Sequence, residues 1–216
     1  LDQRKVESLY WTFYAFSPYL WDEHLWFEVA VTREYLVHEL AGAVSPFMSM
    51  IVESCFFGQE LNFRLHGATL DLSEAGDSTH LQTIWADHYC SIADFLALQE
   101  LLGSKGARGS KPCPLCRNIL NHKYGDAEHS GGRFEKLTCV DTDRWVPHTD
   151  ETIRIIARDL LDSHAQFRRG DITKVEWEKR QQRNGFRALP HHIVLNERID
   201  YRAASTMVFD WMHTWC

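Results

Sequence analysis

The sequence predicts a mixed α/β (α+β) fold that is interrupted by an irregular, zinc-stabilised Cys/His insertion. Three observations support this fold class. Aromatic, β-prone segments near the start alternate with segments whose apolar residues recur at helical spacing, at 33–57 and 92–102. Cysteines and histidines then gather within residues 103–150, together with most of the turn formers. A chain of 216 residues is also long enough to bury a core.

Strands and helices are expected in turn before the insertion. The segments 9–16 and 26–32 are rich in aromatic and β-branched residues, which predicts two strands. Across 33–57 apolar residues recur every three or four positions, which predicts a helix with a kink near Gly42 and Pro46.

Three shorter elements lead to the insertion. Segment 61–72 alternates apolar and polar residues around His66 and Gly67, which predicts a hairpin. Segment 81–86 predicts a strand that ends at Asp87, and 92–102 predicts an amphipathic helix.

Helical patterns return after the insertion, at 152–167 and 173–183. We therefore divide the chain into a first core part at 1–102, a zinc-binding insertion at 103–150, and a helical continuation at 151–216. The chain begins at Leu1 without a signal-peptide pattern and ends at Cys216 inside an aromatic run, so we expect a fragment of a longer protein.

Charge is distributed unevenly along the chain. The net charge is −7, but residues 20–102 alone carry −11. Segment 103–124 carries +5 with no acidic residue, and 168–187 carries +4. Such asymmetry is compatible with nucleic-acid contact, although for 168–187 alone a solvated charged helix is the preferred interpretation. No window of about 18 apolar residues lacks charge, which excludes a membrane-spanning helix.

The strongest local motif is the C-x-x-C pair of Cys113 and Cys116. Two thiolates on a tight turn are typical zinc ligands, and the basic residues before them favour the thiolate form. For the remaining two ligands of a structural site we select Cys139 and His148, with His122 and His129 as competitors. The clustering of these residues favours metal binding in a reducing, intracellular compartment over disulfides.

Other interpretations of these residues remain open. A C-x-x-C pair can be a redox site, although the flanks here are Gly- and Pro-rich and lack the βαβ context of thioredoxin. Asp87 suits a Mg²⁺ ligand at a strand end, or an N-cap of the following helix. Asp210 and His213 share one helical face and could hold a ligand, or Asp210 could be a helix cap.

The order of these motifs resembles that in the catalytic region of CACTA-like and dinoflagellate-type DDE/D transposases, which cut and paste DNA. The resemblance rests on Asp87 and its helix, the segment KGARGSKPCPLC at 105–116, the Cys/His stretch, Leu189-Pro190 and the final Asp210-Trp-Met-His213.

This resemblance implies an RNase H-like core in which three carboxylates hold two Mg²⁺ or Mn²⁺ ions. Asp87 matches the second carboxylate, while the first and third would lie outside the chain. Asp210 and His213 match a motif element that shapes the fold. The chain departs from the family pattern at His88, where relatives carry an acidic or small apolar residue, and this leaves the activity of this copy open.

The resemblance further implies the partner and the location. We expect a DNA-binding transposase fragment, inactive alone, that binds transposon ends and target DNA in the nucleus and forms homo-oligomers. Phosphates would be bound by four of the basic residues of the insertion: Lys105, Arg108, Lys111 and Arg117. The alternatives are a non-enzymatic, zinc-stabilised protein-interaction module and an unrelated metal-dependent nuclease.

Overall fold

The structure, a computed structural model, describes residues 6–11, 27–71, 81–88, 90–93, 95–121, 134–136 and 139–209. Its helices are α1 (Glu34–Glu39), α2 (Val44–Phe56), α3 (Phe95–Leu102), α4 (Asp150–Arg169) and α5 (Lys174–Asn184). Its strands are β1 (Val6–Trp11), β2 (Phe27–Arg33), β3 (Ala68–Asp71), β4 (Leu81–Ile84), β5 (Ser91–Ala93), β6 (Ile119–Leu120), β7 (Glu135–Lys136) and β8 (Met207–Phe209).

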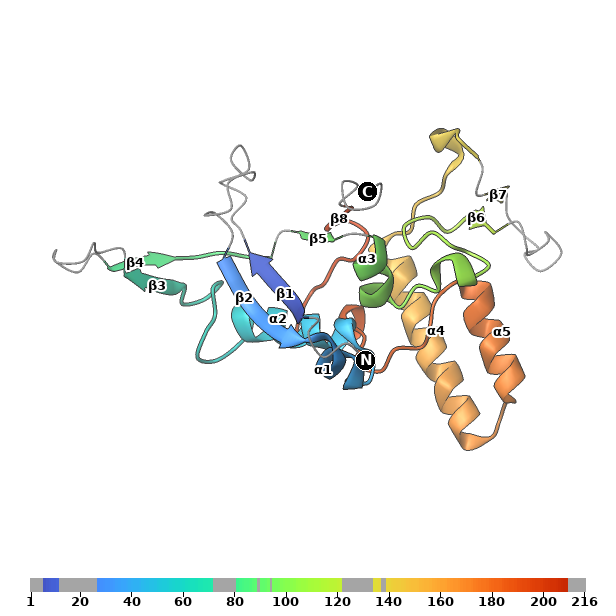
Figure 1. The fold of residues 1–216 in the computed structure, drawn as a ribbon, viewed down its shortest axis with the longest axis horizontal. Helices are drawn as coiled ribbons and strands as arrows, with labels where there is room; N and C mark the ends of the chain where they lie inside the picture. The colour runs from blue at the N-terminus through green and yellow to red at the C-terminus, as the bar shows by residue number, and fades with distance from the viewer. Residues whose placement is uncertain are drawn as a thin grey trace.

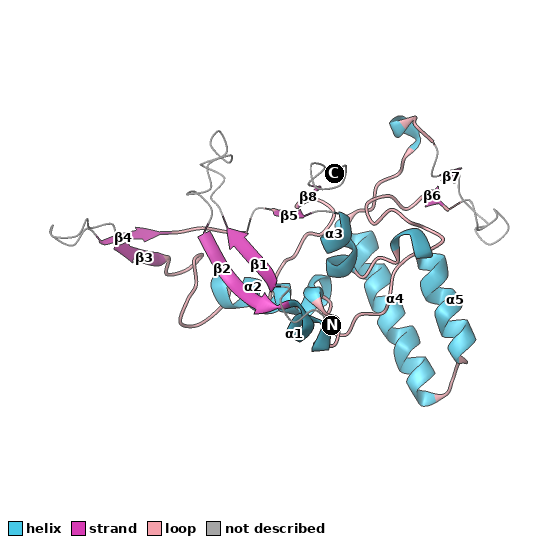
Figure 2. Cartoon of the chain, in the orientation of Figure 1, coloured by secondary structure: helices cyan, strands magenta, loops and turns pink. Residues whose placement is uncertain are grey.

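The molecule is elongated. The β3–β4 hairpin extends at one end and the α4–α5 hairpin at the other, with α1, α2 and α3 between them (Figure 1). Helices and strands alternate along the chain, so the mixed α/β class is confirmed (Figure 2).

The described strands form four two-stranded sheets. The pairs β1–β2 and β3–β4 are antiparallel, whereas β5–β8 and β6–β7 are parallel. An RNase H-like core would have a larger mixed sheet, and it stays a prediction.

The helix expected across 33–57 is divided into α1 and α2. Gly42 has φ of 102° and Ala43 has φ of 52°, and two successive residues with positive φ cannot continue a right-handed helix. Pro46 lies in the first turn of α2, where its missing N–H is not needed. The predicted kink is therefore a complete break, and it lies at Gly42 and Ala43.

Two segments before the insertion pair with more distant parts of the chain than predicted. The carbonyl of Asn62 accepts the N–H groups of His66 and Gly67, which closes a turn, but β3 then pairs with β4. The predicted hairpin within 61–72 was therefore wrong. The helix predicted from residue 92 begins at Phe95, because residues 91–93 form β5 and pair with β8.

The α4–α5 hairpin follows its prediction closely. Thr149 and Thr173 accept N-cap hydrogen bonds, and Gly170 and Gly185 end the two helices in the left-handed conformation. The indole of Trp177 on α5 stacks on Phe167 of α4, with 5.0 Å between the ring centroids. This contact holds the two helices together.

The core lies where α2, α3 and α4 meet the chain after α5. Its buried side chains are those of Val52, Cys55, Phe56, Leu101, Leu102, Ile153, Ala157, Leu160, Phe186, Ile193, Val194, Ile199, Tyr201 and Ala203. No helix in the described part of the chain is long and apolar enough to cross a bilayer.

Candidate metal centre and nucleic-acid interface

The C-x-x-C turn contains one thiol that readily loses its proton. Cys116 is buried and Cys113 is half-buried. A hydrogen bond from the Cys116 thiol, aided by the backbone N–H groups of Leu115 and Cys116 and opposed by burial, lowers the pKa of Cys113 to about 7. The same interaction raises the pKa of Cys116. Neither cysteine forms a disulfide, so near neutral pH Cys113 is partly ionised and Cys116 is a thiol.

His148 lies directly beside this turn. Its backbone N–H donates to the carbonyl of Leu115 at 2.8 Å, and Pro147 forms an antiparallel bridge with Cys116. The side chain is 5% exposed and contacts the ring of Phe186 edge-on. Burial, reinforced by the charges of Lys111 and Arg117, lowers the pKa of His148 to about 4. The imidazole is therefore neutral at physiological pH.

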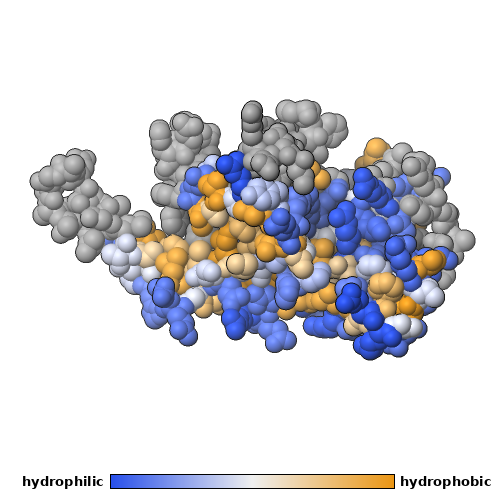
Figure 3. Space-filling model, turned by 60° about the horizontal axis from the view of Figure 1, so that its bottom comes forward, coloured by the Kyte–Doolittle hydropathy of each residue, from blue (hydrophilic) through white to orange (hydrophobic). Residues whose placement is uncertain are grey.

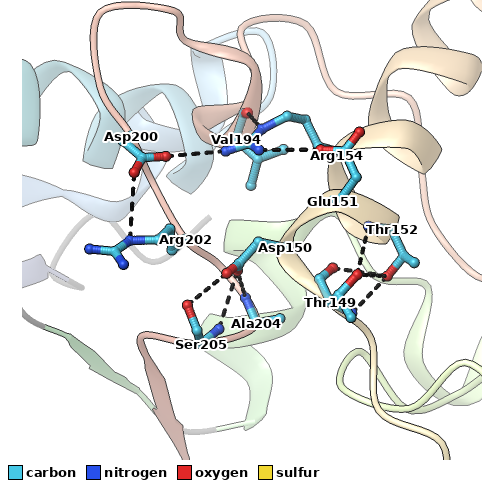
Figure 4. Close-up of polar contacts among 10 residues, drawn as sticks. All are labelled: Thr149, Asp150, Glu151, Thr152, Arg154, Val194, Asp200, Arg202, Ala204 and Ser205. Atoms are coloured by element: carbon cyan, nitrogen blue, oxygen red, sulfur yellow. Dashed lines mark hydrogen bonds and ion pairs between the residues drawn. The ribbon is translucent and has the colours of Figure 1, made fainter.

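The hydroxyl of Thr152 lies beside the imidazole of His148. It donates to the carbonyl of Thr149 at 2.9 Å and accepts the backbone N–H of Thr149 at 2.8 Å (Figure 4). His148 Nδ1 lies 3.2 Å from the same hydroxyl oxygen. His148 Nε2 is buried and has no hydrogen-bond partner in the described structure.

No contact of the described residues brings Cys139, the other predicted ligand, to the C-x-x-C turn. The thiol of Cys139 donates to the carbonyl of Asp141 at 3.6 Å. Within the described ranges, no three His, Cys, Asp or Glu side chains are grouped to hold a metal ion. His122 and His129 lie outside those ranges.

Cys113, Cys116 and His148 are nevertheless of the donor types found in structural zinc sites, and His148 Nε2 is buried without a partner in the described structure. In the arrangement described, they do not form a closed metal centre.

The four predicted phosphate-binding residues differ in exposure. Arg108 and Arg117 are exposed, whereas Lys105 and Lys111 are half-buried. The ammonium group of Lys111 lies 5.9 Å from the ring centroid of Phe134, and burial, with the charge of Arg117, lowers its pKa. Lys111 is therefore partly enclosed by this segment, where burial disfavours its charged form.

The two basic segments of the sequence lie side by side in the structure. The N–H of Lys105 donates to the carbonyl of Gly185 at 2.8 Å, and the N–H of Arg187 donates to that of Gly103 at 2.6 Å. Ser104 and Phe186 form an antiparallel bridge between them. Sequence patterns gave no signal for this pairing, because the segments are separated by about 80 residues.

Strand β4 ends at Ile84, earlier than predicted, so Asp87 lies in the loop after it and is an exposed partner of an arginine. Its carboxylate lies 3.4 Å from Arg64 Nε and also accepts the N–H of His88 at 2.8 Å. The helix after it begins at Phe95, so the N-cap interpretation was wrong.

A second carboxylate shares a cavity of about 70 Å³ with Asp87. This is Asp200, whose oxygens lie 3.4 Å from Arg154 and 3.6 Å from Arg202 (Figure 4). Because arginines neutralise both carboxylates, the two do not fit a divalent-cation site in this arrangement.

Sequence reasoning missed a buried polar network next to Asp87. The hydroxyl of Tyr201 donates to Ser91 Oγ at 2.8 Å, and His88 Nε2 lies 3.1 Å from the same oxygen. Burial raises the pKa of Tyr201 to about 12 and lowers that of His88. The network joins β5 to the core, and a lone His88 in the sequence could not reveal it.

Asp210 and His213 lie outside the described residues, so their predicted roles stay predictions. Comparison of the chain with protein-family models, curated proteins and solved structures gives no match in any of the three.

Proposed function

We propose that this chain is the DNA-binding part of a DDE-type transposase or of a domesticated descendant, held in shape by one structural zinc ion. The observation that supports the proposal most directly lies around the C-x-x-C turn. A thiolate–thiol pair and a buried, neutral imidazole lie on adjacent backbone segments, and exposed Arg117 directly follows the pair. The order of the sequence motifs supports the transposase assignment.

Cys113, Cys116 and His148 would hold the zinc ion, with the fourth ligand from Cys139, His122 or His129. The ion supplies no chemistry in a closed site, because all four positions are taken by protein ligands. Its contribution is to folding, since ligands that are scattered in the unfolded chain meet only in the folded one.

DNA contact follows from the charge around this turn. Exposed guanidinium groups bind phosphate oxygens in bidentate fashion and release counterions from the duplex. Arg108 and Arg117 are the exposed members of the predicted set, and Lys105 adds a half-buried charge. Because contacts with phosphate do not depend on base identity, we expect an affinity that depends strongly on salt and little on the DNA sequence.

The proposal assigns no catalytic step to this chain. In the complete enzyme Asp87 would be one of three carboxylates that hold Mg²⁺ or Mn²⁺. In the described structure its carboxylate is paired with Arg64, so it does not fit such an ion as it stands. Nuclear location and self-association belong to the proposal as properties of the parent transposase.

Fluorescence anisotropy of the full chain with a labelled duplex of about 20 base pairs, over a salt series, tests the proposal. We expect binding at about 50 mM salt that weakens steeply towards 200 mM, with a slope of −0.9 for each phosphate contact on a log–log plot. Absence of binding at the lowest salt would reject DNA binding.

A protein-interaction module is the second candidate. Large apolar side chains are exposed on the acidic part of the chain, among them Val31 at 53%, Met50 at 61% and Leu65 at 72%. Figure 3 shows apolar residues across the middle of one face of the molecule. A chain that holds zinc but binds no DNA would favour this function.

A further inference from the structure

We propose that Arg187, which follows α5, is part of the same phosphate-binding surface as Lys105 and Arg108, so that the nucleic-acid site is built from both basic segments. This inference rests on the proposed DNA binding. The partner of this surface is the phosphodiester backbone of a polynucleotide.

The backbone pairing places Lys105 and Arg187 near each other in the fold. Ser104 and Phe186 form an isolated antiparallel bridge and are 1% and 3% exposed, so they face the core. The N–H of Lys105 donates to the carbonyl of Gly185, and the N–H of Arg187 donates to that of Gly103, so both residues flank this bridge. Lys105 is half-buried and Arg187 is exposed.

The two cations are close enough to affect each other. Burial, followed by the positive charge of Arg187, lowers the pKa of Lys105, and Glu178 acts in the opposite direction. Arg187 is exposed, and the described part of the chain gives it no ion pair with a carboxylate. By contrast, Arg154, Arg180 and Arg198 each bind a carboxylate. An external anion that lies near both Lys105 and Arg187 would reduce their mutual repulsion.

Arg108 lies next to this pair through a second set of contacts. Its carbonyl accepts a hydrogen bond from the Gln182 side chain at 2.8 Å, and the backbone N–H of Ser110 donates to the Gln182 carbonyl at 3.3 Å. The segment that carries Arg108 is thus fixed to the last turn of α5. A phosphate backbone, with its repeating anions, matches such a row of cations better than a single anion does.

The test compares Arg187→Gln with Arg168→Gln in the anisotropy titration. Both changes remove one positive charge from an exposed residue. Arg168 lies on the last turn of α4, at the opposite end of the helical hairpin (Figure 1). We expect about tenfold weaker binding and a salt slope smaller by about one for Arg187→Gln, and little change for Arg168→Gln. Arg187→Lys, which keeps the charge, should recover most of the affinity.

Each outcome bears on one claim. If Arg187→Gln binds like Arg168→Gln while the wild-type chain binds DNA, the inference is wrong and the proposed function stands. If the wild-type chain binds no DNA, the proposed function fails and the inference with it. Circular dichroism of both variants controls for folding. The fold should be intact in Arg187→Gln, because Arg187 binds the carbonyl of Gly103 through its backbone N–H, which the substitution keeps.

Discussion

At the residue scale, Thr152 connects the candidate metal centre to α4. Its hydroxyl lies 3.2 Å from Nδ1 of His148 and completes the capping box with Thr149 at the start of the helix. A hydrogen-bond partner that orients a metal-binding histidine raises metal affinity about 10- to 100-fold. In the proposed zinc site, one side chain thus affects both metal affinity and helix stability.

Thr152→Val should therefore weaken zinc binding by at least about tenfold in competition with a chromophoric chelator. Thr152→Ser keeps the hydroxyl and should bind as the wild type does. Thr149→Val is the control for helix stability, since it removes the N-cap acceptor and costs about 1 kcal/mol while the Thr152 hydroxyl beside His148 is kept. Equal zinc affinity in Thr152→Val and wild type would show that the hydroxyl does not orient His148.

Individual site residues were predictable to the extent that their signals are local. The C-x-x-C spacing identified Cys113 and Cys116, which the structure places in one interacting turn. The choice of Cys139 rested on composition alone, and the described contacts do not bring it to that turn. Arg187 was overlooked because its neighbour Lys105 is distant in the sequence.

At the element scale, the two helix-ending glycines offer a matched comparison. Gly170 and Gly185 both adopt positive φ, at 84° and 79°. A Cβ at Gly170 would meet nothing within 4 Å, whereas one at Gly185 would lie 2.6 Å from the carbonyl oxygen of Lys111. The second glycine is therefore required both for its conformation and for the close approach of the basic segment.

Gly170→Ala should cost about 1 kcal/mol in urea unfolding, the usual penalty for the left-handed conformation. Gly185→Ala should cost at least about 1 kcal/mol more, because Lys111 must move. It should also weaken DNA binding, since the carbonyl of Gly185 accepts the N–H of Lys105. Equal losses of stability in the two variants would contradict the packing role of Gly185.

Helices were easier to predict than strands, because the signals that define helices are local in the sequence. The caps of α4 and α5 lie within a few residues of each helix end, so local sequence decides their bounds. Strand β5 pairs with β8, and β3 with β4, through partners that periodicity cannot identify. A residue-by-residue pattern therefore placed the start of α3 too early.

At the scale of the whole molecule, the fold brings the two basic segments of an acidic chain together. The net charge of −7 predicts poor affinity for DNA if it is taken as an average. Pairing of the segments around Lys105 and Arg187 concentrates positive charge beside the Cys/His turn. Charge segregation was visible in the sequence, but the joining of its two basic parts was not.

The central claim is that zinc holds the DNA-binding shape, and the duplex affinity of the full chain with and without zinc tests it most directly. Anisotropy titrations at about 50 mM salt would use zinc-loaded protein, protein stripped by a chelator, and stripped protein with zinc restored. We predict at least about tenfold weaker binding after stripping and full recovery on restoration. Equal affinity in all three states would contradict the claim.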